Sequence, residues 1–262
     1  MNMNETMKEI RKSILRTSHL GRDGNIQSCF SSAEILWVLY DRVMRISPEL
    51  AKNNVHDRFV LSKGQSNLAL MAVLARKGYL PLSELDTFGQ YDSRISMQAD
   101  RTKLDGIVET SAGSLGHGFP MAVGMAWASA IKGTDERIFV LAGDGEMNEG
   151  TMWEAALFAS SEKMDHLTLI IDDNDSIGRM LDMGDMEAKL RAFGFSVQQV
   201  DGHDVEHLEK VLLSKEKGKP SAVIAHTVRG YGSPTLMEDR SWFHRWPNES
   251  ELVQLIREVD VF

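Results

Sequence analysis

One short segment constrains the fold of this chain more than any other. Gly143, Asp144 and Gly145 follow the run 137–142, which has the length and residue types of a buried parallel strand. The residues after them, 151–159, have the pattern of an amphipathic helix. Asp144 is therefore expected at the carboxyl end of a strand, directly before a helix, where open α/β sheets bind their ligands.

A second segment is predicted to reach the same edge of the sheet. The apolar run 167–172 reads as the next strand, and Asn174 follows it. A carboxylate and an amide oxygen on neighbouring strand ends are hard ligands that suit Mg²⁺. The glycines beside Asp144 allow the backbone to approach phosphate groups closely. Together the two segments predict a site for Mg²⁺ and a diphosphate.

The spacing of these motifs resembles the thiamine diphosphate motif, in which Gly-Asp-Gly is followed by an asparagine thirty residues after the aspartate. Glu149-Gly150, the segment 153–156 and Asp172 resemble the transketolase family in particular. The resemblance implies thiamine diphosphate and Mg²⁺ as cofactors, with Asp144, Asn174 and the backbone carbonyl of Ser176 as metal ligands.

The same resemblance implies further site residues. Those expected to bind the cofactor are Ser28, Lys63, Gln65, Gly113, Ser114, Leu115, Asp144, Gly145, Glu146, Asn174, His226 and Phe243. Those expected to take part in catalysis are Asn25, Gln65, Gln98, Glu149 and His226. Glu149 has an alternative interpretation as an ordinary acidic residue in a first helical turn, favoured there by the helix dipole. His226 has an alternative interpretation as a structural histidine.

Several positions depart from the family pattern together. Four histidines expected in the pocket are replaced, by Asn25, Gln65, Gln98 and Phe243, and a lysine after the last strand is replaced by His226. Amide side chains form hydrogen bonds with hydroxyls but do not exchange protons near neutral pH. Loss of one positioned base costs ketol transfer roughly 10²–10⁴-fold in rate, whereas decarboxylation needs no such base.

The leading prediction is therefore a decarboxylase or carboligase that acts on a modified sugar, such as a nucleotide-linked one, or on a 2-oxo acid. The first alternative is an ordinary split transketolase that moves a two-carbon ketol unit between sugar phosphates. The second is a non-catalytic regulatory subunit that keeps the metal motif for folding. The presence of Asp144, Asn174 and Glu149 together argues against this last alternative.

The resemblance covers only the diphosphate-binding half of a full transketolase. The family's other half supplies the pyrimidine-binding domain and the glutamate that activates the cofactor. We therefore expect the partner to be a separate pyrimidine-binding subunit, in an α2β2 heterotetramer. A small-residue helix over 121–131 is a candidate for part of that contact, and Ala126 lies within it.

The alternation of strand and helix patterns predicts one α/β domain, residues 1–262, with three layers and a mostly parallel sheet. The second helix is expected from Ser31, with Glu34 completing a capping box. Residues 88–110 and 227–248 are expected to be long loops, and 177–184 to close over the cofactor. Strands are predicted at 59–62, 137–142, 167–172, 195–200 and 221–226. Helices are predicted at 5–19, 67–77, 121–131, 151–159, 186–193, 205–213 and 249–259.

The composition excludes several other classes of function. A net charge of −9 argues against nonspecific binding of nucleic acid. The only cysteine, Cys29, excludes an intrachain disulfide and fits a reducing compartment. The N-terminus lacks a signal-peptide pattern and no stretch of about 18 apolar residues occurs, so a cytoplasmic protein without a membrane span is expected.

Overall fold

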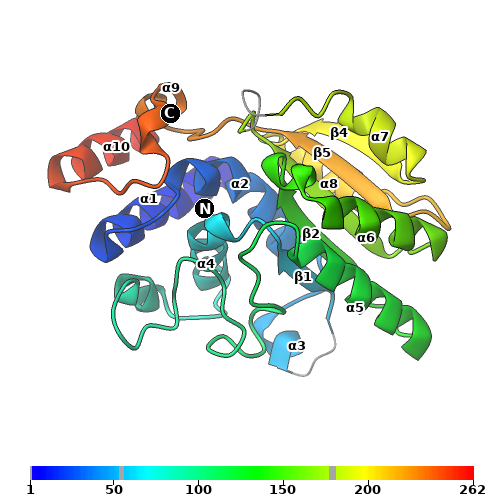
Figure 1. Ribbon diagram of the computed structural model, residues 1–262. Coiled ribbons are helices and arrows are strands. Elements are labelled where there is room, and N and C mark those ends of the chain that lie inside the picture. Colours follow the sequence, from blue (N-terminus) through cyan, green and yellow to red (C-terminus); the bar gives the residue numbers. More distant parts are fainter. Residues whose placement is uncertain (1, 53–55, 177–180) are drawn as a thin grey trace.

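Five parallel strands form the centre of the molecule (Figure 1). The computed structural model describes residues 2–52, 56–176 and 181–262. The strands are β1 (Arg58–Leu61), β2 (Ile138–Gly143), β3 (Leu167–Asp173), β4 (Ser196–Asp201) and β5 (Ser221–His226), in the order β1-β2-β3-β5-β4. In the register of β2 and β3, Gly143 lies opposite Asp172. The two predicted ligand segments therefore leave the sheet side by side.

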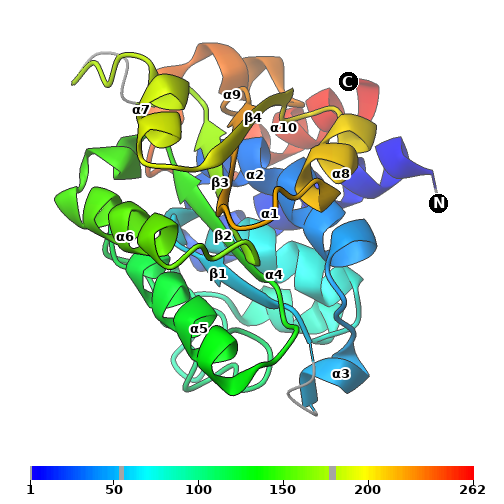
Figure 2. The ribbon, with the colours of Figure 1, turned by 90° about the vertical axis from the view of Figure 1, so that its right-hand side faces the viewer.

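Helices cover both faces of this sheet, as predicted (Figure 2). One face carries α5 (Gly118–Lys132), α6 (Gly150–Ser161) and α7 (Met186–Ala192); the other carries α1 (Met3–Gly21), α2 (Ile26–Val38), α4 (Asn67–Arg76), α8 (Val205–Leu213) and α10 (Glu249–Val261). Successive strand residues point to opposite faces. Phe59 and Leu61 accordingly join the core under α1, α2 and α4, while Val60 joins the core under α5 and α6.

The start of the second helix differs from the prediction. Helix α2 begins at Ile26, and the Asn25 side chain caps it by accepting a hydrogen bond from the Ser28 backbone N–H at 3.3 Å. The prediction of a capping box formed by Ser31 and Glu34 is therefore wrong. Ser31 is a helix-interior residue whose hydroxyl donates to Asp172 at 2.7 Å, a contact from a distant strand that no local pattern reveals.

The predicted loops contain short ordered elements. Segment 227–248 includes the helix α9 (Pro234–Glu238) and a 3₁₀ turn, Arg240–Trp242, and the connection before β1 includes α3 (Pro48–Lys52). Segment 88–110 has no helix or strand, as expected. A short π-helix follows α2 at Leu39–Val43, and 3₁₀ segments occur at Gly64–Ser66, Leu82–Thr87 and Gly145–Asn148. The predicted closing segment, 177–184, lies partly outside the described residues.

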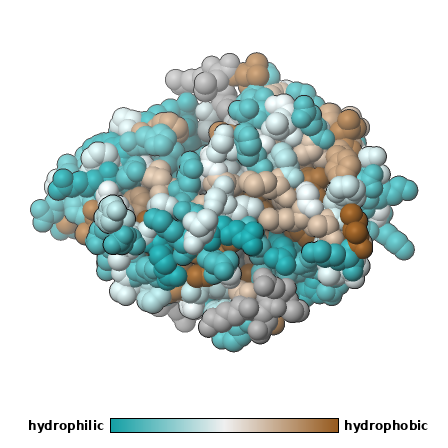
Figure 3. All heavy atoms as spheres, turned by 60° about the horizontal axis from the view of Figure 1, so that its bottom comes forward, coloured by the Kyte–Doolittle hydropathy of each residue, from teal (hydrophilic) through white to brown (hydrophobic). Residues whose placement is uncertain are grey.

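The exposed side of the small-residue helix α5 is not the side that carries Ala126, the residue named in the candidate partner contact. Ala126 is fully buried in the core beneath α5, so it belongs to the interior of this chain. The exposed large apolar side chains of α5 and α6 are Met121, Trp127, Ile131, Leu157 and Phe158. Apolar side chains gather at this edge of the surface, on the right of Figure 3. No helix among the described residues is long and apolar enough to cross a membrane.

Candidate active site

A cleft of about 750 Å³ opens at the carboxyl ends of β2 and β3. Most residues that the sequence assigns to the site line it. They are Asn25, Ser28, Lys63, Gln65, Leu115, Asp144, Gly145, Glu146, Glu149, Asn174, Ser176 and Phe243. The lining also includes Gly143, Asn148, Leu181, Arg229 and Arg240. The sequence motifs thus converge on one cavity, at the sheet edge where parallel α/β proteins bind ligands.

Asp144 is held in place at the floor of this cleft. Its backbone N–H donates to the Asp172 carbonyl at 3.1 Å, which continues the pairing of β2 with β3 by one residue. Its carboxylate accepts hydrogen bonds from the Gly145 N–H at 2.9 Å and the Ser176 N–H at 2.7 Å, and one from the Ser176 hydroxyl. Asp144 and Ser176, both assigned to the metal, are therefore direct neighbours.

Asn174 supplies the feature of this cleft that most clearly requires a ligand. Its amide nitrogen donates to Asp172 at 3.2 Å, and this contact orients the side chain. Its amide oxygen is buried and has no hydrogen-bond partner among the residues that the structure describes. A buried acceptor without a partner costs about 1–3 kcal/mol. A hard cation beside Asp144 would satisfy this oxygen, so the residues present fit Mg²⁺.

The donor set needs oxygen atoms from outside the protein. Within residues 2–52, 56–176 and 181–262, no group of three His, Cys, Asp or Glu side chains could hold a metal by itself. One carboxylate, one amide oxygen and a backbone carbonyl leave several positions of an octahedral ion open. That arrangement suits an ion bound together with a diphosphate.

Lys63 lines the cleft and forms a buried ion pair with Asp172. Its ammonium group donates to the Asp172 carboxylate, and both side chains are almost fully buried. Burial alone would raise the pKa of Asp172, but the charge and hydrogen bond of Lys63, with hydrogen bonds from Thr227 and Ser31, hold that pKa below its ordinary value. Asp172 in turn orients Asn174. The pair therefore supports the ligand residues from below.

Glu146 fixes the segment 113–118, which leads into α5 and contributes Leu115 to another wall of the cleft. Its buried carboxylate accepts hydrogen bonds from the backbone N–H of Gly116 at 2.8 Å and of Gly143 at 3.4 Å, and from the Ser62 hydroxyl. Burial raises the pKa of Glu146 despite these bonds. Gly116 has a φ of 82°, and a Cβ there would overlap the Glu149 side chain. A glycine is needed at this position for the loop to close on the cleft.

Four predicted site residues lie outside the cleft lining: Gln98, Gly113, Ser114 and His226. The first and second are close neighbours, since a Cβ on Gly113 would overlap the Gln98 amide. His226 is half-exposed at the end of β5, with Nδ1 2.8 Å from Asp173 and Nε2 2.7 Å from Gln199. Both ring nitrogens are thus occupied by surface partners.

Two arginines that the sequence reasoning missed line the cleft. Arg229 is partly buried and makes no hydrogen bond or ion pair within the described part of the chain. Burial, followed by the charge of Arg240, lowers its pKa, while Asp144 and Asp175 act in the opposite direction. Arg240 lies 3.5 Å from Asp175. Arg229 comes three residues after His226, which the sequence assigned to the site.

Comparison with known proteins identifies a family that this chain matches over nearly its whole length. A family profile described as "Transketolase, thiamine diphosphate binding domain" matches residues 4–259. The chain is 37% identical over 235 residues to the 6-deoxy-6-sulfo-D-fructose transketolase subunit SqwG of a Clostridium species, which covers 87% of this chain and 82% of that relative. It is 34% identical over 255 residues to an apulose-4-phosphate transketolase subunit of Actinobacillus succinogenes. That alignment covers 95% of this chain and 92% of the relative.

Solved structures show the same fold. The transketolase of Campylobacter jejuni superposes with a TM-score of 0.88 at 28% identity, over the whole of this chain and 43% of that one. The transketolase of Leishmania mexicana gives 0.88 at 26% identity, over 99% of this chain and 41% of that one. The chain thus spans about two fifths of the length of these solved transketolases.

Proposed function

The chain belongs to the transketolase family, whose thiamine diphosphate binding domain it matches from residue 4 to residue 259, and from this premise we propose that it is the cofactor-binding subunit of a two-chain transketolase. Its reaction would be the transfer of a two-carbon ketol unit between sugars. The observation that carries this proposal is that the cleft holds both the Asp144 carboxylate and the Asn174 amide oxygen, for which the described residues provide no hydrogen-bond partner, on neighbouring strand ends.

The cleft residues divide by the group that each would hold. Asp144, the Asn174 amide oxygen and the Ser176 carbonyl would bind Mg²⁺. The segment 143–149, which leads into α6 and includes Gly143 and Gly145, would face the diphosphate. Arg229, a cation in the same cleft with no partner among the described residues, would neutralise part of the phosphate charge. When bound, thiamine diphosphate supplies the carbon nucleophile that accepts the two-carbon unit.

Ketol transfer is favoured over the decarboxylation that the sequence led us to expect. Both near-full-length relatives are named as transketolase subunits, at 37% and 34% identity. Asn25 and Gln65, which stand where the family pattern has histidine, line the cleft and can donate and accept hydrogen bonds with sugar hydroxyls. They would orient the sugar, and proton transfer would fall to groups outside this chain.

A partner subunit completes this proposal. The two relatives are named as subunits, and an α2β2 assembly with a pyrimidine-binding chain would give two sites. Helices α5 and α6 begin directly after loops that line the cleft, so their exposed apolar side chains continue from its edge. A partner that closes the cleft would cover this face.

The substrate is proposed to be a sugar that carries an anionic group. The names of the two relatives specify a sulfo-sugar and a sugar phosphate. Arg240 lies at the cleft, half-exposed, and its contact with Asp175 is long enough at 3.5 Å to be exchanged for an incoming anion. Phe243, which is 58% exposed, would cover the apolar side of the sugar.

Product analysis of the reconstituted pair tests the proposal. The two chains are incubated with Mg²⁺, thiamine diphosphate, a ketose phosphate donor and an aldose phosphate acceptor, and in parallel with 2-oxo acids. We expect a new ketose two carbons longer than the acceptor and no CO₂. Release of CO₂ from a 2-oxo acid without ketol transfer would support the decarboxylase alternative, and cofactor binding without either product would support a regulatory subunit.

A further inference from the structure

Arg229 reaches the cofactor cleft from a tight turn that follows β5. The turn runs from Val228 to Tyr231 and is closed by a hydrogen bond from the Tyr231 N–H to the Val228 carbonyl at 3.1 Å. Arg229 is its second residue and lines the cleft. Gly230 is the third, with a φ of 72°, and its N–H donates to the Gln27 carbonyl at 3.1 Å. The direction of Arg229 therefore depends on what holds the two ends of this turn.

One histidine, His203, contacts both ends of the turn. Its Nε2 accepts a hydrogen bond from the Val228 N–H at 2.9 Å. Its ring stacks on the Tyr231 ring, with centroids 3.6 Å apart and planes 13° apart. Because a backbone N–H only donates, Nε2 carries no proton and the proton of the ring lies on Nδ1. Nδ1 is 3.1 Å from the Glu34 carboxylate, so it donates a hydrogen bond there.

Glu34 joins this histidine to an arginine that holds the same turn. Its other carboxylate oxygen accepts from Arg11 Nη2 at 2.6 Å, and both side chains are almost fully buried. Arg11 Nε donates to the Tyr231 carbonyl at 2.6 Å. Burial would raise the pKa of Glu34, but the charge of Arg11 and the hydrogen bond from His203 hold that pKa below its ordinary value. The ionised carboxylate thus connects two side chains that both contact the turn.

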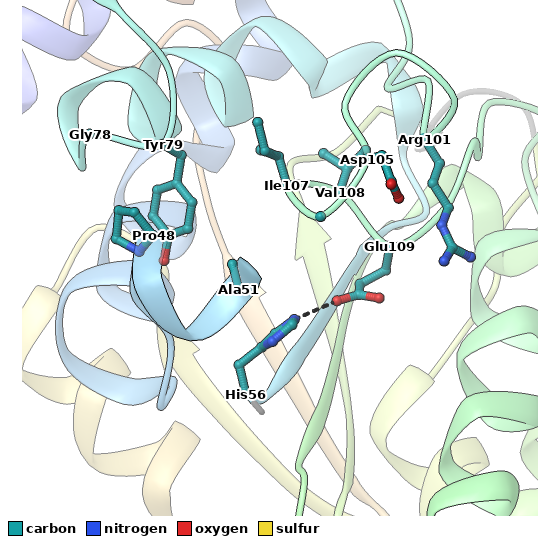
Figure 4. Close-up of a pocket in the computed structure, with 11 residues that line it drawn as sticks. Pro48, Ala51, His56, Gly78, Tyr79, Arg101, Asp105, Ile107, Val108 and Glu109 are labelled. Atoms are coloured by element: carbon teal, nitrogen blue, oxygen red, sulfur yellow. Dashed lines mark hydrogen bonds and ion pairs between the residues drawn. The ribbon is translucent and has the colours of Figure 1, made fainter. Parts of the chain in front are cut away.

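A second buried pair of a histidine and a carboxylate lies in a separate cavity. His56 Nε2 is 2.9 Å from Glu109, in a cavity lined by α3, the residues after α4 and the segment 101–109 (Figure 4). The side chains of His56 and His203 are 3% and 7% exposed. This cavity shares no residue with the cofactor cleft. The His56 pair is therefore a matched control, because it has a similar histidine and carboxylate without the contact to the turn.

The contacts of the turn are what fix the direction of Arg229. Its guanidinium group makes no hydrogen bond or ion pair within the described part of the chain. A long, flexible side chain without such contacts is aimed by its backbone. We propose that Glu34 and His203 are positioning residues, which aim Arg229 at the diphosphate by holding the turn. This inference rests on the proposed role of Arg229 in binding the diphosphate.

A double-mutant cycle tests the proposal by calorimetric titration of thiamine diphosphate with Mg²⁺ into the chain with its partner. His203→Phe keeps an aromatic ring to stack on Tyr231 but removes the hydrogen bonds to Val228 and Glu34. We expect it to weaken binding about tenfold in the wild-type background. In the Arg229→Ala background the same substitution should change the affinity by less than about twofold, because effects that act through one residue are not additive.

Two further variants separate positioning from general stability. His203→Gln, whose amide both donates and accepts, should bind within about threefold of the wild type. His56→Phe should leave the affinity within about twofold, because its pair does not contact the turn. Urea denaturation should show lower stability for both His203→Phe and His56→Phe. Only the first of these two variants should lose affinity for the cofactor.

The outcomes distinguish this inference from the proposed function. An equal loss for His203→Phe in both Arg229 backgrounds, or a similar loss for His56→Phe, would show a merely structural role and overturn the inference. If the wild type binds, Arg229→Ala weakens binding and His203→Phe does not, the inference alone fails. If Arg229→Ala binds like the wild type, the proposed role of Arg229 fails and the inference fails with it. A wild type that does not bind the cofactor at all would overturn both the proposed function and the inference.

Discussion

At the scale of single residues, the cleft depends on side chains whose partners are distant in sequence. Arg229 lines the cleft from the segment after β5, and His226, only three residues earlier, is occupied by Asp173 and Gln199. The two side chains therefore have different expected roles despite their proximity. Arg229 should matter for the cofactor and His226 should not.

Substitution of each residue tests this difference. Arg229→Ala removes a charged hydrogen-bond donor from the diphosphate region, so the affinity for thiamine diphosphate with Mg²⁺ should fall about 10- to 100-fold. His226→Ala should leave that affinity within about threefold, because its ring nitrogens face surface partners. Calorimetric titration measures both. A larger loss for His226→Ala than for Arg229→Ala would contradict the structure of the site.

The buried pair of Lys63 and Asp172 makes a prediction about stability and pH. Because the pKa of Asp172 is lowered in the folded state, its contribution to stability is complete above the ordinary value of 3.8 and is lost as the pH falls through the folded value. Asp172→Asn removes this contribution. The difference in unfolding free energy between wild type and Asp172→Asn should be constant from about pH 7 to about 5 and narrow below about pH 4.

Urea denaturation at a series of pH values provides the measurement. A difference that stays the same down to about pH 3 would show that Asp172 does not carry the charge assigned to it. Lys63→Met complements this experiment, because it leaves a buried carboxylate without its cation and should cost about 3–5 kcal/mol at neutral pH.

At the scale of secondary-structure elements, the start of α2 combines a structural and a site role. Asn25 is buried, caps the helix through its side chain and lines the cleft. Asn25→Ala should lower stability by about 1 kcal/mol through loss of the cap, whereas Asn25→Ser should retain it within a few tenths. Urea denaturation distinguishes the two. Equal stability of all three proteins would mean that the cap contributes nothing.

The exposed face of α5 and α6 is the element expected to contact the partner subunit. Trp127 is 46% exposed and packs edge-on against Phe158 with ring centroids 5.4 Å apart. Trp127→Asp should weaken association with the partner about tenfold or more, because buried aromatic residues dominate such contacts. Sedimentation velocity of the mixed chains measures this.

Leu213→Asp is the matched control for that experiment. Leu213 is similarly exposed, at 48%, but lies at the end of α8 on the opposite side of the sheet. Its substitution should leave association unchanged. If both variants assemble like the wild type, the partner binds elsewhere. If Trp127→Asp instead abolishes self-association of this chain alone, the face joins two copies of it.

At the scale of the whole molecule, strand and helix periodicity predicted the layers and the position of the cleft. The apolar runs before Asp144 and before Asn174 are local patterns, and parallel pairing places their ends together. What the sequence did not predict depends on contacts between distant segments. Ser31 reads as a cap by local rules, yet its hydroxyl bonds to Asp172, 141 residues away.

The sequence points to those cleft residues that belong to local motifs, and it does not point to those positioned by contacts between distant segments. The glycine-bearing motif and Asn174 lie on adjacent strand ends, whereas Arg229 and Arg240 come from a segment whose path depends on α9 and the turn after it. Gln27 holds that segment through hydrogen bonds to the carbonyls of Leu236 and Asp239, and no periodicity in the sequence reveals these contacts. Ala126 faces inward for a similar reason, since its burial depends on the sheet that α5 packs against.

The central claim is that the Asn174 amide oxygen and the Asp144 carboxylate bind a metal ion that holds thiamine diphosphate. Calorimetric titration of thiamine diphosphate into the chain with its partner, with Mg²⁺ and with a chelator, tests it most directly. We predict that binding requires Mg²⁺ and weakens about 10- to 100-fold in Asn174→Ala, which removes one ligand. Binding of equal strength without a divalent cation, or unchanged in Asn174→Ala, would contradict the account.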